Sequence, residues 1–389
     1  MNEFLQKPIR TYAYLGIWPL VGSSKFFNEF RYVFGLLFVI GIVVLDTFVY
    51  IGISTQWGDW GTVFEAASFS FTFTIVLVKI YVVHSHRDKM ILLSKDIDSY
   101  VNEILLDNND KKIAILLGYQ QRVNNINNFI WISSSLTFVF ICLWPISFIL
   151  STQDYSLRLL MIQAYFPFSL NTIVLGFITL THSVTFEIFF IACILFAIAR
   201  IKILQHSIER VDIVARQKFN TIFKNESIYS RNWNEKFQIY FGIELKKCIE
   251  EHQRIEAFCK TINSLISPVL FILWFSYSMI MCVIGMYAMF VEPSLNVWKL
   301  GQYLAVLFSQ IFIYFWYGDE LSTESIKVAD SAWETHWYDF GKRNIKMIIF
   351  MISRSQNGIS MRVGKFREVD LPTFLSVGIY HQLIVEPKH

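Results

Sequence analysis

Residues 170–198 read LNTIVLGFITLTHSVTFEIFFIACILFAI, a run of 29 residues in which Glu187 is the only Asp, Glu, Lys or Arg. A bilayer core about 30 Å thick is crossed by about 20 apolar helical residues, so this run can span a membrane as one helix. Comparable apolar runs recur along the chain at 33–53, 62–83, 130–150, 265–291 and 300–317. The sequence therefore predicts six transmembrane helices.

The composition indicates a polytopic membrane protein with an all-α fold. Of 389 residues, 54 % are hydrophobic and 17 % are charged, and the mean hydropathy is +0.43. Soluble domains carry about a quarter charged residues, so a disordered protein, a disulfide scaffold and an ordinary cytosolic enzyme are excluded. The net charge of +3 comes without a Lys- or Arg-rich block, so no nucleic-acid partner is expected.

A seventh run, 371–385, decides where the carboxyl terminus lies. It has fifteen residues and contains Pro372, Gly378, His381 and Gln382, so on apolarity alone it is a marginal span. Positive residues near span ends stay in the cytoplasm, and 28 of the 34 Lys and Arg residues fall in 1–30, 84–128, 200–263 and 318–365. We therefore expect the amino terminus inside, and the carboxyl terminus outside if the seventh run crosses.

The loops assigned to the cytoplasm have helical patterns of their own. In 200–263, apolar residues recur at three- and four-residue steps: Ile208, Val211, Phe219, Ile222, Leu245 and Ile249. In 318–365, Trp333 and Trp337 are four residues apart and are followed by Ile345, Ile348, Ile349 and Ile352. Because apolar faces must be buried, these segments predict a helical bundle beneath the membrane, continuing from the fourth and fifth spans.

The sequence gives little support for an enzymatic function. The sequence lacks HExxH, GxSxG, phosphate-loop and dinucleotide motifs, so we expect neither an enzyme nor a cofactor. Cys248, His252 and Cys259 could ligate a metal, because a four-residue step places the first two on one helix face. The favoured alternative is a helix with two buried thiols and one solvated imidazole. No cysteine pair faces the oxidising side, so no structural disulfide is expected.

Ionisable residues inside the predicted spans are functional candidates, because charge is costly in a bilayer. Glu65 and Lys79 lie near span ends and are expected to snorkel to the interface. Glu187 is expected at the inner end of an overhanging helix, in a packing or interface role. Asp46 and His182 lie deeper, where each could be either functional or a hydrogen-bonded polar spot in the bundle.

Aromatic residues in the outer halves of the spans could line a pocket for a small molecule. The candidate ligand-binding residues are Phe71, Phe138, Cys142, Phe177, Ile178, His182, Tyr303 and Leu307. The set offers large apolar surfaces and few hydroxyl groups, so a charged ligand would lose its hydration without compensation. A small, neutral, hydrophobic volatile is the expected ligand.

Several motifs resemble those of insect odorant receptors. They are Tyr14-Leu15-Gly16-Ile17-Trp18-Pro19-Leu20, Tyr317-Gly318-Asp319-Glu320-Leu321, Trp333 with Trp337-Tyr338, Arg354-Ser355-Gln356, Gly364-Lys365-Phe366 and Thr373-Phe374. Two departures stand out: Tyr380-His381-Gln382 replaces a Tyr-Ser-Tyr, and Asn357-Gly358 follows where the family has Pro. The chain lacks the longer second inner loop of the family's shared co-receptor, so it resembles a ligand-specific tuning subunit.

The resemblance implies a ligand-gated cation channel, a heterotetramer with odorant co-receptor subunits in the plasma membrane of sensory-neuron dendrites. It implies a cytoplasmic amino-terminal segment (1–30), six spans with the ligand pocket in their outer half (31–317) and a cytoplasmic anchor (318–370). Trp333, Trp337 and Tyr338 would lie at subunit contacts. The last helix would be split, and 371–389 would hold its pore-lining part and the extracellular carboxyl terminus. A hydrophobic ring can gate by dewetting; Leu383 is the first candidate, with Gln382 and Ile384 beside it.

Two alternatives remain open. A gustatory-type receptor of the same fold would carry a Thr-Tyr-x5-Gln-Phe signature in its last helix, which we do not find. A polytopic transporter would show inverted repeats or broken helices in matching positions, and neither is evident.

Overall fold

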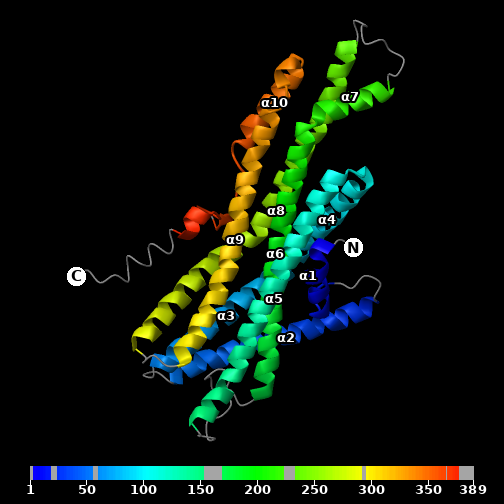
Figure 1. Ribbon diagram of the computed structural model, residues 1–389. Helices are drawn as coiled ribbons and strands as arrows, with labels where there is room; N and C mark the ends of the chain where they lie inside the picture. The colour runs from blue at the N-terminus through cyan, green and yellow to red at the C-terminus, as the bar shows by residue number, and fades with distance from the viewer. Residues whose placement is uncertain are drawn as a thin grey trace, which may run out of the picture. The chain divides into compact units, whose positions relative to one another are not determined.

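The computed structural model describes residues 3–18, 24–55, 60–152, 169–222, 233–290, 295–364 and 366–375. Almost all of them are helical, which confirms the all-α class (Figure 1). The helices are α1 Glu3–Tyr14, α2 Lys25–Thr55, α3 Trp60–Ser85, α4 Arg87–Asp107, α5 Asp110–Thr152, α6 Ser169–Glu209, α7 Val211–Ile222, α8 Trp233–Phe290, α9 Leu295–Trp333, the 3₁₀ turn η1 Trp337–Asp339, and α10 Lys342–Ser355. Two short strands, β1 Arg362–Val363 and β2 Arg367–Glu368, pair antiparallel.

Five of the six predicted spans lie in helices long and apolar enough to cross a membrane: α2, α3, α5, α6 and α8. The sixth, 300–317, is helical within α9. No 18-residue stretch of its described residues has a mean hydropathy as high as in those five helices. Gln302 and Gln310 interrupt its apolar sequence. Of the seventh run, residues 371–375 form a helical turn, begun by the Thr373 N–H donating to Asp370 Oδ1 at 2.8 Å; the rest lies outside the described residues.

The chain divides into two compact units. The first holds residues 1–95, 123–192 and 265–314, and the second holds 96–122, 193–264 and 315–389. Helices α4, α5, α6, α8 and α9 each have residues in both units. The 41 residues of α6 and the 58 of α8 confirm that helices of the fourth and fifth spans continue beyond the membrane-spanning runs.

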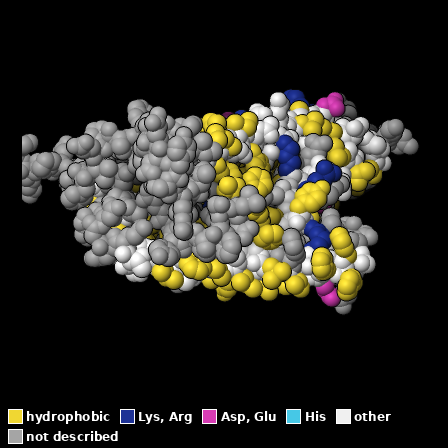
Figure 2. Space-filling model, turned by 90° about the horizontal axis from the view of Figure 1, so that it is seen from below, with side chains coloured by type: hydrophobic (Ala, Val, Ile, Leu, Met, Phe, Trp, Pro, Cys, Tyr) yellow, Lys and Arg dark blue, Asp and Glu magenta, His cyan; other side chains and the backbone are white. Residues whose placement is uncertain are grey.

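In the first unit, α2 and α3 pack along one apolar seam. Its buried residues are Ile42, Leu45 and Val49 of α2, Ala66, Phe69, Phe73, Val76 and Ile80 of α3, and Ile141 of α5. Their three- and four-residue spacing puts each set on one helix face. The opposite face of α2 exposes large apolar residues, among them Phe30, Leu37 and Ile40. Many hydrophobic and few charged side chains mark the described surface in Figure 2, as a lipid-facing bundle requires.

In the second unit, α4 and α5 form a tight antiparallel hairpin (Figure 1), turning at Asn108, whose φ is 47°. Helix α10 lies against α8, where Asn344 Nδ2 donates to the Gln238 carbonyl at 2.9 Å. The helical pattern expected through Trp333 and Trp337 is interrupted, because α9 ends at Trp333 and Trp337 begins η1. Ile222 and Ile349 also differ from their expected burial, since both are exposed.

Candidate functional site

The predicted ligand residues form two groups, and each group contacts the α2–α3 seam. In the first group, the rings of Phe138 of α5 and Phe177 of α6 lie 5.9 Å apart at 59°. Cys142 is one turn after Phe138 and is partly buried, and Ile178 follows Phe177 and is partly buried. The pair joins the seam through neighbours, because Ile141 belongs to its core and Leu175 packs against it.

The second group joins α3 to α9. The hydroxyls of Thr72 and Tyr303 form a hydrogen bond, and the Tyr303 ring lies 5.9 Å from that of Phe69, a member of the seam. Leu307 is buried one turn after Tyr303, and Phe71 is partly buried beside Thr72. The structure thus brings the predicted residues together as two groups, each touching one apolar core.

Asp46 is a buried carboxylate that is held by hydroxyl groups. Asp46 of α2 is buried and accepts hydrogen bonds from Ser70 Oγ at 2.8 Å and Thr74 Oγ1 at 3.3 Å, both on α3. This confirms the interpretation of Asp46 as a hydrogen-bonded polar spot in the bundle. His182 of α6 is buried as well. The side chain of Glu65 lies outside the described part of the protein.

Lys79 and Glu187 form a buried ion pair, which overturns the expectation for Lys79. Lys79 of α3 is 2 % exposed and Glu187 of α6 is 1 % exposed, and Lys79 Nζ donates to Glu187 Oε1 at 2.5 Å and to Ser183 Oγ at 2.8 Å. The expected snorkelling of Lys79 is wrong, whereas the packing role expected of Glu187 is confirmed. Each charge is compensated by the other, so neither needs to reach water. The Phe186 ring centroid lies 5.8 Å from Lys79 Nζ.

The second unit holds a buried arginine that the sequence analysis did not single out. Arg200 of α6 is 1 % exposed, and its guanidinium donates to Glu251 of α8 at 2.9 Å and to Asp96 of α4 at 2.9 Å. Its Cζ lies 4.4 Å above the ring of Tyr100. An arginine that directly continues an apolar run was the available signal, but its carboxylate partners lie 104 and 51 residues away in sequence.

The other residues singled out in the sequence are the anchor, gate and metal-ligand candidates. Trp333 is 63 % and Tyr338 is 64 % exposed, and the Trp333 and Trp337 rings lie 5.4 Å apart. The gate candidates Gln382, Leu383 and Ile384 lie outside the described residues. Cys248, His252 and Cys259 are all buried, so the expected solvated imidazole is wrong, and no cluster of three or more metal-binding side chains occurs in the described ranges.

Comparison with known proteins identifies the family. Residues 59–378 match the family described as 7tm Odorant receptor. Odorant receptor 10 of Aedes albopictus is 20 % identical over 344 residues, 87 % of each chain, and Odorant receptor Or2 of Anopheles gambiae is 22 % identical over 353 residues, 86 % of each.

Solved structures share the fold. The insect olfactory receptor OR5 from Machilis hrabei superposes with a TM-score of 0.78 at 15 % identity, covering 98 % of this chain and 97 % of that one. The structure of that receptor in complex with eugenol gives 0.77 at 16 % identity, covering 98 % of each.

The class that these observations define is a multi-pass membrane receptor. The chain belongs to the 7tm odorant receptor family, and it is an odorant receptor rather than an enzyme.

Proposed function

We propose that this chain is the tuning subunit of a ligand-gated, non-selective cation channel that opens together with odorant co-receptor subunits. The observation that carries the proposal is the family match over residues 59–378. The receptor would be a heterotetramer in the plasma membrane of a sensory-neuron dendrite. Its amino terminus would be cytoplasmic and its carboxyl terminus extracellular, following the distribution of Lys and Arg.

The proposed ligand is a small neutral volatile that contacts the two aromatic groups beside the α2–α3 seam. Support comes from the apolar character of the Phe138–Phe177 pair. It also comes from Tyr303, whose ring contacts Phe69 and whose hydroxyl forms a hydrogen bond with Thr72. The structurally similar receptor OR5 has been solved with eugenol. A ligand favours the conducting state only by binding it more tightly than the closed state, so contacts that link α3, α5, α6 and α9 suit a gating role.

The anchor and the pore complete the proposal. Exposed Trp333 and Tyr338, at the end of α9 and in η1, offer apolar surface for contacts between subunits. The segment 371–389 would line the pore, with Leu383 as the hydrophobic gate, Gln382 meeting ions once it dilates, and Ile384 as the next candidate.

Electrophysiology tests the proposal. The chain is expressed in cells with and without a co-receptor, and currents are recorded against a panel of neutral volatiles, with surface labelling as the control. We expect currents only when both subunits are present. Surface-exposed receptor that gives no current with the co-receptor, or equal current without it, would contradict the proposal.

The gate assignment has its own variant. Leu383→Ser should raise the current without ligand or change the permeability ratio between cations, because a polar ring no longer dewets. The effect should be partial, since co-receptor subunits supply the rest of the ring. Leu92→Ser, at an exposed leucine of α4 outside the pore-lining segment, is the matched control and should leave both properties unchanged. An unchanged baseline and permeability in Leu383→Ser would place the gate elsewhere.

A further inference from the structure

The buried Lys79–Glu187 pair of the first unit leaves part of its hydrogen-bonding capacity unused. Lys79 Nζ donates to one carboxylate oxygen, Glu187 Oε1, at 2.5 Å and to Ser183 Oγ at 2.8 Å. The second oxygen, Glu187 Oε2, is buried and has no hydrogen-bond partner among the described residues. An acceptor without a donor is costly in the interior of a membrane protein. The ion pair therefore accounts for the charge of Glu187 but not for its second oxygen.

Two tyrosine hydroxyls beside the same carboxylate are also without a partner. Tyr12 of α1 and Tyr314 of α9 are each 1 % exposed, and the hydroxyl oxygen of each is buried without a hydrogen bond in the described part of the chain. Glu187 acts electrostatically on both hydroxyls, and the two hydroxyls also act on each other. Three buried oxygen atoms from α1, α6 and α9 thus lie around one point with their hydrogen bonds unmade.

Ring contacts place the same helices together independently. The Tyr12 ring centroid lies 6.5 Å from that of Phe189, which follows Glu187 by two residues on α6. Lys79 Nζ of α3 lies 5.8 Å from the centroid of the Phe186 ring, which directly precedes Glu187. The short segment of α6 around Glu187 is therefore a meeting point of helices within the first unit.

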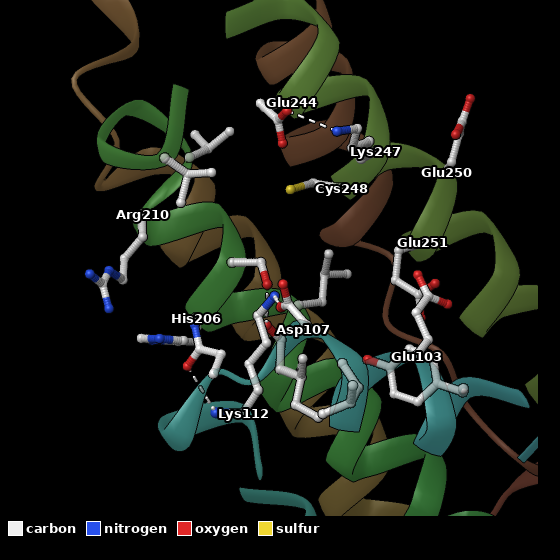
Figure 3. Close-up of a pocket in the computed structure, with 18 of the residues that line it drawn as sticks. Glu103, Asp107, Lys112, His206, Arg210, Glu244, Lys247, Cys248, Glu250 and Glu251 are labelled. Carbon is white, nitrogen blue, oxygen red and sulfur yellow. Dashed lines mark hydrogen bonds and ion pairs between the residues drawn. The ribbon is translucent and has the colours of Figure 1, made fainter. Parts of the chain in front are cut away.

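The second unit shows how charged groups are satisfied without a ligand. It contains a cavity of about 680 Å³ lined by α4, α5, α6, α7 and α8 (Figure 3). Lysines in its wall have carboxylate partners: Lys247 Nζ lies 2.8 Å from Glu244 Oε1, and Lys112 Nζ lies 2.7 Å from Asp107 Oδ2. These side chains need no further partner, in contrast to Glu187 Oε2.

The charge balance at Glu187 decides the class of ligand. Lys79 and Glu187 already neutralise each other, so an added cation or anion would be buried without compensation. The ligand must be neutral, must donate to Glu187 Oε2 and must accept from the hydroxyls of Tyr12 and Tyr314. Water meets all three requirements and is the smallest molecule that does so, and buried waters typically make about three hydrogen bonds to otherwise unsatisfied polar groups.

We propose that an ordered water bridges Tyr12, Glu187 and Tyr314, donating to Glu187 Oε2 and accepting from the two tyrosine hydroxyls. The water extends the ion pair between α3 and α6 to α1 and α9, so that four helices of the first unit share one hydrogen-bond network. The proposal is independent of the volatile ligand and of channel activity.

Radiolytic footprinting tests the site, because an X-ray pulse converts bound water into hydroxyl radicals that oxidise the adjacent side chains. The purified full-length chain in detergent is irradiated, and the oxidation rate of each tyrosine is measured by mass spectrometry of its peptides. Tyr303 is the matched control, because it is buried at 9 % exposure and its hydroxyl is bonded directly to Thr72. We expect Tyr12 and Tyr314 to be oxidised faster than Tyr303, although both are less exposed.

Two reciprocal variants separate the bound water from other causes of oxidation. Tyr314→Phe should abolish the excess oxidation of Tyr12, and Tyr12→Phe that of Tyr314, because the water loses one of its three partners. Tyr303→Phe removes a hydroxyl elsewhere in α9 and should leave both rates unchanged.

The comparison within the wild type decides the proposal even if one variant fails to fold. Oxidation of Tyr12 and Tyr314 no faster than that of Tyr303 would overturn the water site and would favour direct contact between the tyrosines and Glu187. An excess that survives in both folded Tyr→Phe variants would overturn it as well.

Discussion

Breaking the Lys79–Glu187 pair one side at a time should destabilise the receptor far more than removing both charges. The variants are Lys79→Met, Glu187→Met and the double variant. Both side chains are almost fully buried and 2.5 Å apart, so neither can relax into water when its partner is lost.

The magnitudes follow from the geometry. At 2.5 Å and an effective dielectric constant of about 20, the attraction is about 7 kcal/mol. Desolvation costs several kcal/mol per ion, so the pair contributes little net stability. Removing one partner leaves a buried, uncompensated charge and should cost about 3–5 kcal/mol, whereas replacing both with apolar side chains should be close to neutral.

The assay is thermal unfolding of purified receptor in detergent. Unfolding is monitored as the loss of the monodisperse elution peak. Arg122→Gln is the control, because the Arg122–Glu320 pair, at 3.1 Å, has an exposed arginine and should be worth less than about 1 kcal/mol. Single variants as stable as Arg122→Gln would refute the reasoning. The reasoning would also be refuted if the double variant were no more stable than the less stable of the two single variants.

Three further outcomes are expected. Phe138→Ala and Phe177→Ala should each shift the half-activating concentration of a volatile by about tenfold without altering ion selectivity, because each removes one ring of a contacting pair; unchanged dose–response curves for both would remove this pocket. Replacing Trp333 and Trp337 together with Ala should reduce the recovery of tetramers on native gels, and full recovery would argue against the anchor. Burial raises the pKa of Glu324, but hydrogen bonds and charges from nearby lysines outweigh it and lower the pKa overall. Its stabilisation is therefore complete above the ordinary Glu pKa of about 4.3 and is lost as the pH falls below it, so wild type and Glu324→Gln should converge in Tm in acid.

The helices were predictable because their signal is local. A run such as 170–198 must be helical in a bilayer, since each backbone group has to be satisfied within its own segment. The extension of α6 and α8 beyond the predicted spans followed from three- and four-residue apolar spacing. The end of α9 at Trp333 was missed because a four-residue step between two tryptophans is also compatible with a helix that stops between them.

The polar pairs could not be predicted, because they depend on which helices are neighbours. Lys79 and Glu187 are 108 residues apart, and the sequence around either residue does not indicate that the other is its partner. A lone Lys near a span end is well explained by snorkelling, and only the approach of α3 to α6 makes a buried pair possible. Arg200 was missed for the same reason, since its partners lie on α4 and α8.

Two of the polar contacts of helix α3 lie more than two turns apart, and this spacing has a physical consequence. Apolar packing fixes the rotation of a helix weakly in a membrane, because lipid tails are as apolar as leucine. Ser70 ties α3 to α2 through Asp46, and nine residues later, about 13–14 Å along the helix, Lys79 ties α3 to α6 through Glu187. Two directional contacts on one helix specify its rotation and its register at once. The Phe69–Tyr303 contact lies one residue before the first of them. A ligand that displaced Tyr303 would therefore act on a helix held by two polar contacts, which favours a shift between discrete arrangements over gradual deformation.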